Sequence, residues 1–68
     1  MDLIGMGMRI QEARKEKGWN QDQFAEILEV SKQTVGNIET GKKGTRLQNF
    51  VKICQVLEKS ADYILFGK

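Results

Sequence analysis

Apolar residues recur at helical spacing in five stretches of the chain, and short polar connections separate these stretches. In the first stretch Met6, Ile10 and Ala13 follow one another at i, i+4 and i+7, which predicts an amphipathic helix over residues 6–17. Residues 1–5 show neither a cap nor a clear period, so we expect them to be disordered or frayed.

Two short helices are expected next, and each follows a polar residue that can cap it. Asn20 and Gln23 have the spacing of a capping box, in which each side chain bonds the other residue's backbone N–H. Ser31 can cap the third helix, where Val35 and Ile38 are the apolar pair that would face a core. The pattern therefore predicts two helices with a tight turn between them.

The C-terminal third of the chain predicts two further helices. Thr45 and Gln48 also have capping-box spacing, and we expect the helix that follows to be the longest. Its inward residues are expected to be Leu47, Phe50, Val51, Cys54 and Leu57, flanked by Ile53 and Val56. Ser60 would start a final short helix that ends at Gly67. With no proline and no strand pattern, the chain is predicted to be all-α, a single domain over residues 6–67.

The third predicted helix has an unusually thin apolar face. If Val35 and Ile38 point inward, then at about 100° per residue Gln33 and Thr40 point almost directly away from the core. The outer residues are uncharged or basic: Lys32, Gln33, Gly36, Asn37 and Thr40. The paired donor and acceptor of an amide match base edges in the DNA major groove. An ordinary polar surface helix accounts for this segment alone equally well.

Composition excludes several classes of function. A chain of 68 residues forms one domain at most. One cysteine leaves no intrachain disulfide, and the absence of histidine excludes a Cys/His zinc site. With a single thiol inside a core stripe and no carboxylate pair in a recognisable cleft, we expect no enzyme, no metal and no cofactor. No apolar run approaches the roughly 20 residues of a membrane span, and no signal peptide is recognisable, so we expect a cytoplasmic location.

The distribution of charge says more than the net charge of +2. Residues 31–46 hold four of the eleven cations and only one of the nine acidic residues. A solvated surface loop explains such a cluster on charge alone. The alternative is a surface that meets an anionic partner.

Residues 21–40, QDQFAEILEVSKQTVGNIET, resemble the helix-turn-helix of the Cro/cI-like (XRE) repressor family, and the similarity covers about residues 6–67. The matching positions are Gln21, Phe24, Ala25, Leu28, Val30, Ser31, Val35, Ile38, Glu39 and Gly41. The resemblance implies a five-helix lambda-repressor-like domain that binds DNA, with helix 32–40 in the major groove. It further implies a transcriptional regulator, acting as a repressor.

The resemblance also assigns roles to individual residues. The residues expected to contact bases are Lys32, Gln33 and Asn37, with Thr34 and Thr40 at the margin. The residues expected to contact phosphates are Gln21, Lys42, Lys43, Thr45 and Arg46. The family pairs an arginine of the first helix with the glutamate at position 39, which implies an Arg14–Glu39 salt bridge. Such a pair is physically reasonable, because a charge at a core margin is costly unless it is paired; two independently solvated charges are the alternative.

The chain departs from the family pattern in its turns. Glu29 and Glu58 stand where the family commonly has glycine, and the residues 42–45, KKGT, replace a proline. A non-glycine residue with a positive φ costs about 1 kcal/mol. We therefore expect these two turns to be strained or differently shaped.

The resemblance implies partners as well as a fold. The family usually acts as a two-fold dimer on pseudo-palindromic double-stranded DNA, with half-sites about one helical turn apart. Tyr63 and Phe66 are the candidate contacts between the two copies of a homodimer, unless they close the core of one copy. Two alternative functions use the same fold: an antitoxin or adaptor that mainly binds protein, and the DNA-binding part of a larger repressor.

Overall fold

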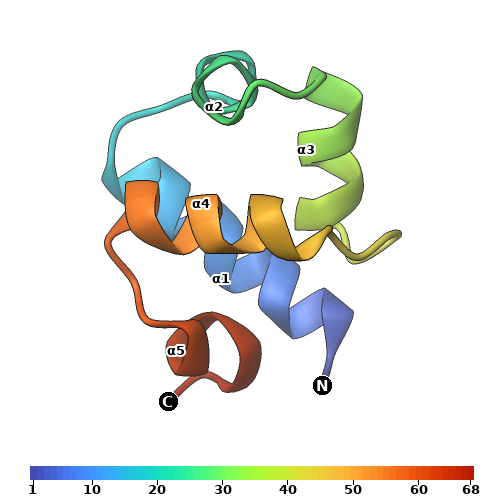
Figure 1. Ribbon diagram of the computed structural model, residues 1–68, viewed down its shortest axis with the longest axis vertical. Coiled ribbons are helices and arrows are strands. Elements are labelled where there is room, and N and C mark those ends of the chain that lie inside the picture. Colours follow the sequence, from blue (N-terminus) through green and yellow to red (C-terminus); the bar gives the residue numbers. More distant parts are fainter.

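The computed structural model describes all residues from Met1 to Lys68 and contains five helices and no strand (Figure 1). The helices are α1 (Leu3–Glu16), α2 (Gln21–Leu28), α3 (Lys32–Glu39), α4 (Leu47–Leu57) and α5 (Ala61–Phe66). In Figure 1, α1 and α4 occupy the middle of the molecule, with α2 and α3 on one side and α5 on the other. The predicted all-α fold with a helix-turn-helix at residues 21–40 is confirmed. None of the five helices is long and apolar enough to cross a membrane.

Local side-chain caps explain where three of the helices begin. Asn20 and Gln23 form a complete capping box at the start of α2. The hydroxyls of Ser31 and Ser60 accept hydrogen bonds from backbone N–H groups in the first turns of α3 and α5. These bonds satisfy backbone donors that have no partner within the helix. The positions of these helices therefore follow from single residues in the sequence.

The N-terminus differs from the expectation that residues 1–5 are frayed. Helix α1 begins at Leu3, and the Asp2 carboxylate accepts a hydrogen bond of 3.1 Å from the backbone N–H of Ile4. An aspartate at this position both caps the helix and complements its dipole. As a result α1, with 14 residues, is longer than α4, with 11, so the expectation that α4 is the longest helix is wrong.

Helix α4 differs from the prediction in both its cap and its buried face. Arg46 is the N-cap and makes no side-chain capping bond, so the predicted Thr45 capping box is absent. Leu47 is 76% exposed and Val51 47% exposed. Ile53, predicted only to flank the buried face, is fully buried. Apolar residues surround much of this helix, so periodicity alone did not determine which side packs against the core.

Glu29 and Glu58, at the two positions where the resemblance implies glycine, both adopt the left-handed conformation. Glu29 has φ 60° at the end of α2, and Glu58 has φ 58° at the end of α4. Each carboxylate lies near a lysine: Glu29 is 3.7 Å from the Lys52 ammonium, and Glu58 is 2.8 Å from that of Lys17. The Lys17 hydrogen bond lowers the pKa of the Glu58 carboxyl below its usual range. Both turns therefore hold a non-glycine residue in the left-handed conformation, which confirms the expectation that they are strained.

One core positions α3 against the rest of the molecule. Val35 and Ile38 are buried and belong to a cluster of eleven apolar side chains drawn from all five helices. Gly7 of α1 lies directly under α3, where an added Cβ atom would approach the Ile38 carbonyl oxygen to 2.4 Å. This contact between two backbones requires glycine at position 7, and it holds α3 close to α1.

Candidate nucleic-acid interface

The outer side of α3 is polar, and its two amide side chains have no partner within the protein. Val35 and Ile38 are buried on the inner side, whereas Gln33 is exposed and Asn37 half-buried. Neither amide side chain takes part in an intramolecular hydrogen bond. Each therefore presents a free donor and a free acceptor, which is the pattern that pairs with a base edge.

A shallow polar hollow brings most of the predicted DNA-contacting residues together. It is lined by Gln21, Lys32, Gln33, Gly36, Asn37, Thr40 and Lys42, and none of them is apolar. These residues come from the start of α2, the length of α3 and the loop after it. An added Cβ atom at Gly36 would meet nothing within 4 Å, so packing within the protein does not require glycine there. The hollow is thus a continuous hydrogen-bonding surface along α3.

The hydroxyls of Thr34 in α3 and of Thr40, its C-cap residue, are less available than the two amides. The Thr34 hydroxyl lies 2.9 Å from that of Ser31, within the cap of α3. The Thr40 hydroxyl donates a bond of 2.8 Å to the carbonyl oxygen of Gly36. Both hydroxyls are already bonded to α3 itself, so Gln33 and Asn37 are the stronger candidates for contacts with a partner.

A second hollow lies on the other flank of α3, between this helix and the start of α4. It is lined by Val30, Ser31, Thr34, Ile38, Gly44, Thr45, Arg46 and Asn49. It brings the predicted phosphate contacts Thr45 and Arg46 together with Thr34. Asn49 was not among the predicted site residues. The polar sequence Gln48-Asn49 at the start of α4 was the only signal for it.

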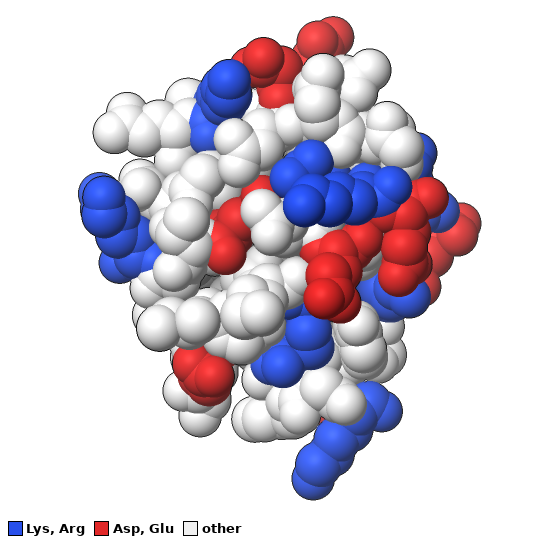
Figure 2. All heavy atoms as spheres, turned by 180° about the vertical axis from the view of Figure 1, so that it is seen from behind, with Lys and Arg blue, Asp and Glu red and all other residues white.

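The cations of the loop after α3 have no acidic partner within the protein. Five basic side chains form ion pairs: Arg14, Lys17, Lys32, Lys52 and Lys59. Lys42, Lys43 and Arg46 are exposed and form none. On the right of Figure 2 blue and red groups are crowded together, whereas on the left, the side of α3, blue groups stand apart among white side chains. The charge of the loop after α3 is therefore free to meet an external anion.

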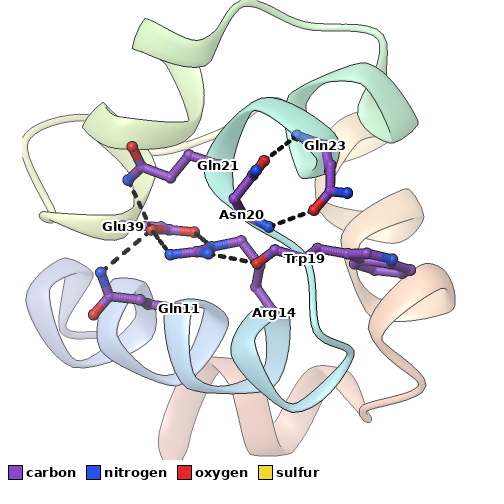
Figure 3. Close-up of polar contacts among 7 residues, drawn as sticks. All are labelled: Gln11, Arg14, Trp19, Asn20, Gln21, Gln23 and Glu39. Carbon is purple, nitrogen blue, oxygen red and sulfur yellow. Dashed lines mark hydrogen bonds and ion pairs between the residues drawn. The ribbon is translucent and has the colours of Figure 1, made fainter.

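Beneath the hollow a buried ion pair fixes the end of α3. The Arg14 guanidinium donates to both Glu39 oxygens, with Nε 2.7 Å from Oε2 and Nη2 3.2 Å from Oε1, and the Glu39 side chain is 1% exposed (Figure 3). Arg14 also donates a 2.7 Å bond to the carbonyl oxygen of Trp19. The paired charges tie α1, α3 and the connection before α2 into one unit.

The same carboxylate also holds Gln21, the residue expected to contact a phosphate. The Gln21 side-chain nitrogen donates a 3.1 Å bond to Glu39 Oε1, and that of Gln11 donates a longer one of 3.4 Å (Figure 3). These two glutamine contacts were not predicted, because they join residues far apart in the sequence. The amide of Gln21 has two N–H groups, so one bond to Glu39 orients it and leaves a second donor.

The two predicted dimer contacts occupy different environments. Phe66 is 54% exposed, whereas Tyr63 is half-buried against the core with the Lys59 ammonium 5.3 Å from its ring centre. Arg9 holds the end of α5 by donating 2.9 Å bonds to the carbonyl oxygens of Ile64 and Leu65. Beside α5 lies an apolar groove lined mainly by Met1, Leu3, Met6, Leu47, Phe50 and Leu65.

The only cysteine is a poor candidate for a reactive site. Cys54 is half-buried and packs against the core cluster. Burial raises the pKa of its thiol above the usual range, so the reactive thiolate is scarcer than in an exposed cysteine. The side chain is a packing residue of α4.

Comparison with known proteins identifies relatives with the same motif and fold. A family model described as "Helix-turn-helix" matches residues 10–64. The chain is 33% identical over 61 residues to the SPbeta prophage-derived uncharacterized HTH-type transcriptional regulator YonR of Bacillus subtilis (strain 168). That similarity covers 90% of this chain and 56% of the relative, so the chain spans little more than half the relative's length.

Two solved structures have a similar fold. The restriction-modification controller protein C.AhdI from Aeromonas hydrophila has a TM-score of 0.83 and 28% identity, over 93% of this chain and 96% of that protein. The clp gene regulator ClgR from C. glutamicum has a TM-score of 0.85 and 23% identity, over 96% of this chain and 83% of that protein. The similarity to ClgR concerns the fold alone.

Proposed function

Because the chain belongs to the helix-turn-helix family, we propose that it binds double-stranded DNA in a sequence-specific manner and regulates transcription. The observation that carries the proposal is the pair of unpartnered amides, Gln33 and Asn37, in a polar hollow along α3. The relatives described as a transcriptional regulator and a controller protein support the same function. Such a protein acts where the DNA is, in the cytoplasm, and we expect no enzymatic activity from it.

In this proposal α3 enters the major groove with its outer side toward the bases. The groove of B-DNA is about 12 Å wide and admits one helix. Gln33 and Asn37 bond base edges, Lys32 can bond the guanine acceptors O6 and N7, and Thr34 and Thr40 lie at the margins. Repression needs no further machinery, because a bound domain can exclude another protein from the same DNA.

Residues on the two flanks of α3 would contact the two sugar-phosphate backbones. On one flank are Gln21 and Lys42, which line the same hollow as the base-contacting residues. On the other flank Thr45, Arg46 and Asn49 lie beside Thr34, and Lys43 adds a free charge in the loop. Contacts of this kind set the position of a protein on DNA without reading sequence.

We further propose that the protein binds as a homodimer on a pseudo-palindromic site. A single small domain buries little DNA surface, and two-fold pairing doubles the contact. The proposed contacts between copies are the exposed apolar residues Leu47, Val51 and Phe66, together with the half-buried Tyr63. These exposed apolar residues also favour the alternative function, an adaptor or antitoxin that mainly binds another protein.

The test is to select bound duplexes from a random DNA pool and to measure the affinity of the winning sequence against a scrambled control. We expect an enriched motif with two-fold symmetry. The selected duplex should bind at least a hundredfold more tightly than the scrambled one. This threshold is a minimum, because specific sites usually bind about 10³- to 10⁷-fold more tightly than non-specific DNA. Selection without enrichment, together with equal binding to both duplexes, would contradict sequence-specific binding. It would leave the protein-binding alternative as the better account.

A further inference from the structure

One acidic side chain stands at the edge of the proposed DNA surface. Asp22 follows Gln21 in the first turn of α2, and its Oδ2 atom lies 3.8 Å from the Lys32 ammonium nitrogen. Both side chains are largely exposed, at 71% for Asp22 and 61% for Lys32. Because Lys32 lines the hollow of the base-contacting residues, this carboxylate lies at the margin of that hollow.

The pairing sets Lys32 apart from the other cations of the surface. Lys42, Lys43 and Arg46 have no acidic partner, whereas Lys32 has one. The other nearby acid, Glu39, is buried and already bonded to Arg14. Asp22 is therefore the exposed negative charge that approaching phosphates would meet beside Gln21.

We propose that Asp22 is a specificity-determining residue of the DNA surface, an inference that rests on the proposed function. In a complex with unrelated DNA, Lys32 is attracted only to phosphates. There Asp22 competes for the lysine and repels the backbone. In the complex with the correct site Lys32 gains guanine acceptors, which offset the loss of its carboxylate partner. Asp22 thus weakens binding to all DNA and weakens non-specific binding the most.

Two simpler roles of Asp22 must be separated from this one. An acidic residue in the first turn stabilises a helix through the dipole, and any acid lowers affinity for DNA through the net charge. Glu26 provides a matched control, because it is an exposed acid on the same helix that makes no ion pair. It lines a different hollow, together with Trp19, Gln23 and Ile27.

The experiment measures binding of the wild type, Asp22→Asn and Glu26→Gln to the selected site and to a scrambled duplex across a range of salt. Asp22→Asn should tighten binding to the scrambled duplex by about two- to five-fold, the range of an exposed ion pair, and tighten binding to the selected site less. The slope of log K against log salt on the scrambled duplex should steepen by up to about one. Glu26→Gln should change both affinities by equal factors. The melting temperature of each variant shows whether loss of the acidic charge near the start of α2 destabilises the fold enough to reduce the fraction of folded protein.

Repeating the comparison in a protein that carries Lys32→Met tests whether Asp22 acts through Lys32. If Asp22 acts through Lys32, Asp22→Asn should no longer change the ratio of the two affinities in that background. Equal effects of Asp22→Asn and Glu26→Gln, or an unchanged effect of Asp22→Asn without Lys32, would overturn the role of Asp22 alone. A wild type with no preference between the two duplexes would overturn this role and the proposed function together.

Discussion

Polar side chains on the two sides of α3 differ in whether they have hydrogen-bond partners within the protein. On the inner side the Glu39 carboxylate receives hydrogen bonds from Arg14, Gln21 and Gln11. On the outer side the amides of Gln33 and Asn37 have no partner in the protein. Arg14 and Glu39 are buried, whereas Gln33 is exposed and Asn37 half-buried. A buried polar group must be satisfied by the fold itself, whereas an exposed one can exchange water for a ligand. The inner side therefore bears on stability, and the outer side on binding.

The strongest test of this division is to break the inner ion pair. Arg14→Ala and Glu39→Ala should each lower the free energy of unfolding by about 3 kcal/mol, because each leaves one buried charge without its partner. The double variant should lose less than the sum of the two. Urea denaturation of the four proteins measures all three values.

An exposed pair provides the contrast. Lys52→Met removes the partner of Glu29 at the surface and should cost no more than about 1 kcal/mol. Additive losses from Arg14→Ala and Glu39→Ala would show that the buried pair acts as two independent charges. The inner side would then not have the role assigned to it.

The loop after α3 should show the reverse behaviour. Replacing Lys42 and Lys43 with glutamine should weaken binding to every DNA sequence and reduce the slope of log K against log salt by about one to two. Stability should change little, because neither lysine has an acidic partner. The matched control replaces Lys15 and Lys68, two other exposed lysines without an ion pair. A changed sequence preference with an unchanged slope would contradict a phosphate role for the loop.

The turn that leads into α3 should give the smallest effect. Glu29→Gly places a residue that tolerates φ 60° where the glutamate is strained. The free energy of unfolding should stay equal or rise by up to about 1 kcal/mol. Glu26→Gly, inside α2, is the control and should destabilise the protein by about 1 kcal/mol. A clear loss in Glu29→Gly would mean that the Lys52 contact matters more than the strain.

The parts of the fold that depend on neighbours in the sequence could be predicted. The caps of α2, α3 and α5 each involve residues three apart, so the spacing alone indicated where these helices begin. The face of α4 could not be predicted, because it carries apolar residues on several sides and only the packed core selects Ile53 over Val51. The start of α1 was missed because Asp2 alone gives a weak signal.

The candidate site also contains features that the local sequence predicts and features that depend on how the helices pack. The outward direction of Gln33 and Asn37 follows from the apolar positions 35 and 38 on the same helix, so it could be predicted from the sequence. The bond from Gln21 to Glu39 and the place of Asn49 beside Thr34 depend on how separate helices pack. Gly7 is a similar case, because nothing in its local sequence shows that α3 passes over it. Apart from the Arg14–Glu39 pair, which the family resemblance implied, the residues that support the site were harder to predict than those on its outer surface.

The most direct test of the account is to compare the wild type and Gln33→Ala on every single-base variant of the selected site. Gln33 points away from the buried residues of α3, and a glutamine amide can bond N6 and N7 of adenine with about 1–3 kcal/mol of discrimination. We predict that Gln33→Ala loses the preference at one symmetric position of each half-site, an A·T pair, while its affinity for unrelated DNA and its stability hardly change. If the variant keeps the full preference at every position, α3 does not read bases through Gln33, and the central claim is contradicted.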